Sequence, residues 1–158
     1  MAQTEAAMPQ QGPSGIGGWL VLPIFGLAVT PLRALFLSGT YYDAFKAFPV
    51  LRTSQATFIV LEALVNLFIL VVAPIALLVF LFRRMRSFPR LYVAWAVLSL
   101  AVMIVDLILV RILFADVFAT RPFFDQATVT ELVRALLLVV IWVPYMLNSR
   151  RVANTFIN

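Results

Sequence analysis

The stretch LYVAWAVLSLAVMIVDLILVRILF, residues 91–114, decides the fold of this chain. Apolar residues fill almost all of it, and at about 1.5 Å per helical residue it can cross the roughly 30 Å hydrocarbon core of a bilayer. Two charged residues interrupt the run: Asp106 lies inside it and Arg111 lies near its end. The stretch therefore predicts a membrane-spanning helix that carries an acid within the hydrocarbon.

Three further apolar runs of similar length accompany this one. The chain of 158 residues is 63% hydrophobic and 12% charged, with a mean hydropathy of +1.02, which lies outside the usual range of soluble domains. We predict an all-α membrane protein with four transmembrane helices in an antiparallel up-down bundle. The expected organisation is a disordered tail over residues 1–15 and one membrane domain over 16–158, with spans at about 16–37, 56–82, 91–114 and 129–147.

The composition argues against an enzyme. The chain contains no cysteine and no histidine, which excludes disulfides, thiol nucleophiles and metal sites built on thiolate or imidazole. No GxSxG, HExxH, P-loop or GxGxxG motif is present. Glu62 and Asp106 could form a carboxylate pair, but nothing in the sequence brings them within reach of each other. We expect a non-enzymatic protein with no cofactor and no metal.

The charge pattern indicates orientation and a lipid partner. The arginines responsible for much of the net charge of +5 lie beside apolar spans, where lipid headgroups are nearer partners than nucleic acid. Short loops rich in arginine stay cytoplasmic, which predicts that both termini are cytoplasmic, as Arg150 and Arg151 support. Contact with anionic lipid is expected for the four arginines of the loop between the second and third spans: Arg83, Arg84, Arg86 and Arg90.

Aromatic residues recur in the loop after the first span. Tyr41, Phe45 and Phe48 follow one another at spacings of four and three, while Asp43 and Lys46 would lie on the other face of a helix. The pattern predicts a short helix lying on the membrane surface. It could serve as an interfacial anchor or as a docking site for a lipid or a partner protein.

Two local patterns predict helix geometry. Pro23 and Pro31 interrupt the first span, so we expect it to be bent and packed against its neighbours, or else broken as in some transporters. Thr128 followed by Glu131 fits a capping box for the last helix.

Polar residues inside the spans form the candidate site. With the predicted topology they reach a similar depth in the outer half of the bilayer, where an unpaired charge costs about 2.5 to 3.5 kcal/mol near the centre. Pairing would relieve this cost, although the arginines and Glu131 could also extend to the headgroups. Asp106 is expected to face the bundle, because it shares a face with Tyr92 and Ser99 at seven-residue spacing. The predicted network comprises Arg33, Glu62, Asn66, Asp106, Arg111, Glu131 and Arg134, with one or more of its arginines neutralising the acids in the second and third spans.

Two short motifs carry a resemblance. Residues 15–20 read GIGGWL, with Gly17, Gly18 and Trp19 at the start of the first span. Residues 142–145 read WVPY and residues 149–156 read SRRVANTF. The chain resembles the YdgK-like proteins, an uncharacterised family of four-span bacterial inner-membrane proteins. The resemblance implies cytoplasmic termini, and it assigns no activity because the function of the family is unknown. Its more specific part is the C-terminal motif, made of Trp142, Pro144, Tyr145, Ser149, Arg151, Val152, Thr155 and Phe156.

These observations leave two functional hypotheses. The first is an accessory or scaffolding component that binds membrane lipid or another membrane protein. The second is a small transporter or channel subunit that uses Asp106 and Glu62 as a polar site, as a homo-oligomer because four short helices enclose little volume. Locking of the helices is the commonest role for such a polar network, and conduction or ligand binding are the alternatives.

Overall fold

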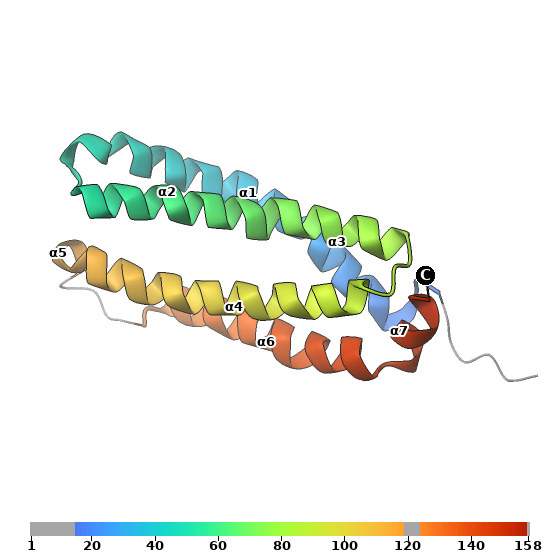
Figure 1. The fold of residues 1–158 in the computed structure, drawn as a ribbon. Helices are drawn as coiled ribbons and strands as arrows, with labels where there is room; N and C mark the ends of the chain where they lie inside the picture. Colours follow the sequence, from blue (N-terminus) through green and yellow to red (C-terminus); the bar gives the residue numbers. More distant parts are fainter. Residues whose placement is uncertain (1–14, 119–123, 158) are drawn as a thin grey trace, which may run out of the picture.

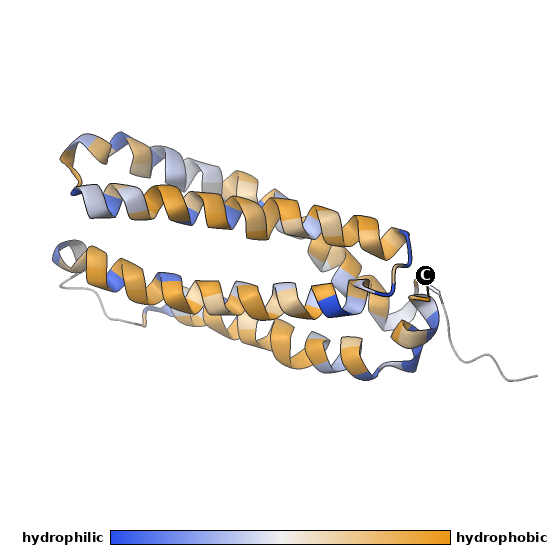
Figure 2. Cartoon of the chain, viewed as in Figure 1, coloured by the Kyte–Doolittle hydropathy of each residue, from blue (hydrophilic) through white to orange (hydrophobic). Residues whose placement is uncertain are grey.

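Four long helices dominate the computed structural model, which describes residues 15–118 and 124–157. The described residues contain no strand, and four of their helices are long and apolar enough to cross a membrane: Gly18–Lys46, Thr53–Phe82, Phe88–Leu113 and Gln126–Asn148. Figure 2 shows these helices as mostly apolar, with hydrophilic residues at intervals. In the most apolar 18-residue stretch of each helix, at most 22% of the stretch is buried inside the protein. Most of the apolar surface therefore faces outward, as lipid requires. The predicted tail lies outside the described residues except for Gly15.

The first span is longer than predicted. A short 3-10 turn, η1 (Gly18–Leu20), leads into α1 (Val21–Lys46), and a second turn, η2 (Phe48–Val50), follows it. Tyr41 and Phe45 of the predicted surface helix therefore lie in the last part of α1, and Phe48 begins the short turn η2. Tyr41 and Phe45 stack one helical turn apart, with ring centroids 6.4 Å apart, which favours continuation of the helix.

The second span contains a π-helical segment. α2 (Thr53–Leu67) and α3 (Ala73–Phe82) are joined without a break by η3 (Phe68–Val72). The cause is Pro74, which occupies the start of α3 and cannot donate a backbone hydrogen bond. The indole Nε1 of Trp95 donates instead to the carbonyl oxygen of Ile69 at 2.9 Å.

The second half of the chain forms α4 (Phe88–Leu113), α5 (Ala115–Phe118), α6 (Gln126–Asn148) and α7 (Arg150–Thr155). The N-cap of α6 is Asp125, whose carboxylate accepts a hydrogen bond from the backbone N–H of Thr128 at 2.7 Å. The predicted capping box is therefore wrong, because Thr128 already lies inside the helix. Glu131 is left free to bind arginines.

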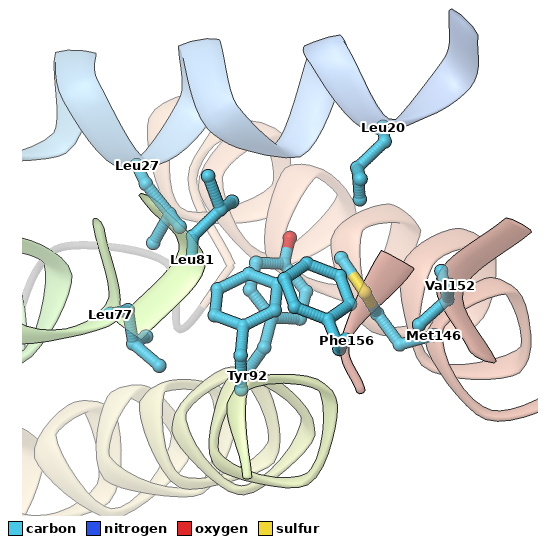
Figure 3. Close-up of a cluster of buried hydrophobic side chains, with 9 residues drawn as sticks. Leu20, Leu27, Leu77, Leu81, Tyr92, Met146, Val152 and Phe156 are labelled. Atoms are coloured by element: carbon cyan, nitrogen blue, oxygen red, sulfur yellow. The ribbon is translucent and has the colours of Figure 1, made fainter. Parts of the chain in front are cut away.

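The hydrophobic core lies at one end of the molecule. α4 packs along α6, while α1 packs against α2, η3 and α3, and Figure 1 shows the long helices side by side. All four spans and α7 contribute to the core at the end where α3 meets α4 (Figure 3). Its buried members are Leu20, Leu27, Leu77, Leu81, Phe88, Tyr92, Met146, Val152 and Phe156.

Candidate functional site

Polar side chains of the first two spans meet in a cluster that we call the tyrosine cluster, made of Tyr41, Glu62 and Asn66. The hydroxyl of Tyr41 donates to Oε1 of Glu62 at 3.0 Å, and Nδ2 of Asn66 donates to the same hydroxyl at 2.7 Å. Glu62 and Asn66 share a face of α2 because they are four residues apart. The sequence identified this pair but not Tyr41, which was predicted to lie on the membrane surface and belongs to α1 instead.

Asp106 of α4 interacts electrostatically with Glu62 and Tyr41 of the tyrosine cluster. Within residues 15–118 and 124–157, its Oδ1 is the one buried side-chain polar atom without a hydrogen-bond partner. A buried acceptor without a donor costs free energy, so this atom is the least satisfied part of the described spans.

A second group of charged residues joins α1 to α6. Nη2 of Arg33 and Nη1 of Arg134 each bind one oxygen of Glu131 at 2.9 Å. All three side chains are at least 40% exposed, so this group lies at the surface rather than within the bundle. The predicted network therefore separates into two groups: Glu62 and Asn66 belong to the tyrosine cluster, and Arg33 and Arg134 bind Glu131. Arg111 lies in the last turn of α4.

The two motifs of the sequence meet in space. The N–H of Gly15 donates to Oγ1 of Thr155 at 3.0 Å, although the two are 140 residues apart. A Cβ atom added to Gly17 or Gly18 would lie 3.2 or 3.3 Å from the guanidinium group of Arg151. We call this contact the glycine–arginine junction, and it ties the beginning of the chain to α7.

The remaining motif residues lie around this junction. Val152 and Phe156 belong to the core, and the rings of Phe156 and Phe88 are 4.7 Å apart. Trp142 packs edge to face on Tyr145 at 5.7 Å, whereas Trp19 is 69% exposed. The motif residues therefore close the end of the bundle that holds the core.

A cavity of about 850 Å³ opens at the same end, and we call it the arginine cavity. Arg86, Arg90 and Ser149 form its polar side, and Leu91, Leu147 and Phe156 form part of its apolar side. Two of the four arginines that were expected to contact lipid, Arg86 and Arg90, line the cavity, and Arg83 and Arg84 do not. The sequence could not reveal the cavity, because its lining residues come from two distant parts of the chain: the loop before α4 with the start of α4, and the end of α6 with α7.

A smaller groove of about 420 Å³ runs between α1 and α2. Tyr41 and Asn66 line it together with apolar residues such as Phe45 and Leu67. The groove thus reaches the tyrosine cluster from outside, and Asp106 is not among its lining residues.

Comparison with known proteins adds a family and a relative. A family model described as "Protein of unknown function (DUF2569)" matches residues 13–157. The inner membrane protein YdgK of Escherichia coli (strain K12) is 28% identical over 151 residues, which cover 92% of this chain and 96% of that protein. No solved structure matches the chain.

Proposed function

Because the chain belongs to the DUF2569 family, whose function is unknown, we propose from its structure that it is a non-catalytic accessory or scaffolding protein of the bacterial inner membrane. Its multi-pass character is supported by the four helices long and apolar enough to span a bilayer. Its location is supported by the inner-membrane relative that matches nearly the whole chain. The bound partner would be lipid, another membrane protein or a second copy of the chain.

The proposed topology is an antiparallel up-down bundle with both termini in the cytoplasm. The loop between α3 and α4 holds three arginines, and a fourth, Arg90, lies in the first turn of α4. Neither this stretch nor residues 148–158, which hold two further arginines, contains an acid. Arginine-rich short loops remain on the cytoplasmic side. The end that contains the core and the arginine cavity would therefore face the cytoplasm.

The observation that carries the proposed role is the use of polar side chains as contacts between spans. Tyr41 of α1 bonds to Glu62 of α2, and Arg33 of α1 binds Glu131 of α6. Gln55 of α2 donates to the carbonyl oxygen of Leu113 in α4 at 2.8 Å. Interhelical contacts of this kind fix helices against one another in a membrane, which suits a scaffold better than a moving carrier.

Purification in mild detergent at native expression tests this role. We expect a stoichiometric membrane protein or retained lipid to accompany the chain through size-exclusion chromatography and to be identified by mass spectrometry. A chain that emerges with neither would contradict the proposal.

A transporter or channel subunit is the second candidate, and one observation favours it. Oδ1 of Asp106 is buried without a partner next to Glu62, and intramembrane acids often mark ion pathways. The prediction that separates the two roles concerns Asp106→Asn in vesicles loaded with a pH-sensitive dye. If the protein is a scaffold, vesicles that contain the wild type or the variant should show the same proton flux as empty vesicles, under either a pH gradient or an applied potential.

The matched control is Asp116→Asn, which makes the same chemical change at an exposed acid that pairs with Arg52. Flux in the wild type that is lost in Asp106→Asn and retained in Asp116→Asn would reject the scaffold and establish the transporter.

A further inference from the structure

We propose that the arginine cavity binds an anionic phospholipid, with the headgroup phosphate on Arg86 and Arg90 and an acyl chain along the apolar side. The inference rests on the lipid-binding part of the proposed function and gives it a site and a lipid class. The cavity volume of about 850 Å³ is within the range of ligand sites in proteins, roughly 300 to 1,000 Å³.

The positive charge of the cavity has no counter-ion in the described chain. Arg86 lies in the turn before α4 and Arg90 in its first turn, and neither forms a salt bridge with any residue of 15–118 or 124–157. The first turn of α4 also lacks an acid, so nothing there offsets the partial positive charge of the helix N-terminus. Two guanidinium groups in this setting fit a phosphate, which they can bind through paired N–H donors.

The apolar side of the cavity explains why the ligand should carry a chain. Met146, Val152 and Phe156 also line it; they are buried in the core and lie together in Figure 3. Leu91 and Leu147 continue this surface outward and are 40% and 59% exposed. A free phosphate would leave these side chains uncovered, whereas an acyl chain would cover them.

The depth of the cavity also fits a lipid headgroup. The cavity lies where α3 has ended at Phe82, where α4 begins at Phe88 and where α6 ends at Asn148. The ends of apolar spans mark the boundary between hydrocarbon and headgroups. A phosphate bound there would therefore stay at its normal level in the bilayer.

The test compares two double variants that remove the same charge. Purified full-length protein is titrated with phosphatidylglycerol or with phosphatidylcholine of the same chains, and bound lipid is counted by native mass spectrometry. Wild type should prefer phosphatidylglycerol. The double variant Arg86→Gln, Arg90→Gln should weaken that binding about tenfold, because each basic residue contributes appreciably to anionic lipid binding. The control double variant Arg83→Gln, Arg84→Gln should weaken it less than about threefold. Equal losses would show diffuse surface attraction and overturn the proposal.

A third variant and a second probe test the chain-binding part. Ala153 is exposed and lines the cavity, so Ala153→Phe should obstruct the apolar side, and lower affinity for phosphatidylglycerol is expected with every arginine in place. Inorganic phosphate at millimolar concentration should not displace the lipid; displacement would identify a free-anion site instead. If the cavity does not bind phosphatidylglycerol but a membrane protein still co-purifies, this inference is rejected and the scaffold role stands. If the cavity binds the lipid but no membrane protein co-purifies, a protein-binding scaffold is rejected and the lipid site stands.

Discussion

At the scale of single residues, Gly18 shows why a motif glycine is needed. Its backbone has φ +57°, a left-handed conformation that costs other residues about 1 to 2 kcal/mol. A Cβ atom there would also lie 3.3 Å from the guanidinium carbon of Arg151. Gly18 therefore permits both the turn into α1 and the close approach of α7.

The first prediction follows from this geometry. Gly18→Ala should lower the free energy of unfolding by about 1 to 2 kcal/mol, measured by circular dichroism as a denaturing detergent is added to mixed micelles. Gly26→Ala is the matched control, because Gly26 is helical and a Cβ atom there meets nothing within 4 Å. The control should be as stable as wild type or more stable. Equal losses at both glycines would contradict the assigned role of the junction.

Residue identity alone gave part of the polar site. Asp106 and Glu62 could be recognised because an acid in an apolar span is costly wherever it occurs. Their surroundings could not, since Tyr41 reaches Glu62 only through the way α1 lies against α2. The same limit applies to Arg33 and Arg134, whose nearest acid proved to be Glu131.

At the scale of elements, the π-helical segment η3 shows how a proline is accommodated in a span. The N–H of Ala73 donates to the carbonyl of Phe68, five residues earlier. The next bond in this register would run from residue 74 to Ile69, and Pro74 cannot donate it. Trp95 of α4 supplies the missing donor, so a local defect in one span becomes a contact between two spans.

The second prediction is a double-mutant cycle on this contact. Trp95→Phe should lower the free energy of unfolding by about 1 kcal/mol in the wild-type background, because the carbonyl of Ile69 loses its donor. In the Pro74→Ala background the loss should be smaller, since the new N–H of residue 74 can donate within the helix. Equal losses in both backgrounds, in the same mixed-micelle assay, would show that the tryptophan acts through packing alone.

At the scale of the whole molecule, stability is unevenly distributed. The core gathers at the end that carries the arginine loop and α7. At the other end an exposed ion pair joins Arg52, the N-cap residue of α2, to Asp116 of α5. Exposed ion pairs contribute little, about 0 to 1 kcal/mol each. The core end should therefore dominate the stability of the bundle.

The third prediction compares two leucines of the second span. Leu81 is fully buried in the core, and Leu64 is 58% exposed. Leu81→Ala should cost about 2 to 5 kcal/mol, because it leaves a cavity, whereas Leu64→Ala should cost less than about 1 kcal/mol. Similar losses for the two variants would mean that the core does not concentrate at this end.

The sequence by itself determined the class of the protein: four apolar runs long enough to span a bilayer, an arginine-rich loop and two terminal motifs. Hydrophobic length and charge are properties of contiguous residues, so they can be read without coordinates. It placed the end of the first span too early and the cap of α6 on the wrong residue, because helix boundaries depend on weak local preferences.

Only the tertiary structure decided which distant side chains meet. The bond of Tyr41 to Glu62, the glycine–arginine junction and the arginine cavity all join segments that are far apart in the chain or on different helices. Such contacts depend on how each helix is rotated and packed against its neighbours, and hydrophobicity that surrounds a helix on every side leaves that rotation unspecified.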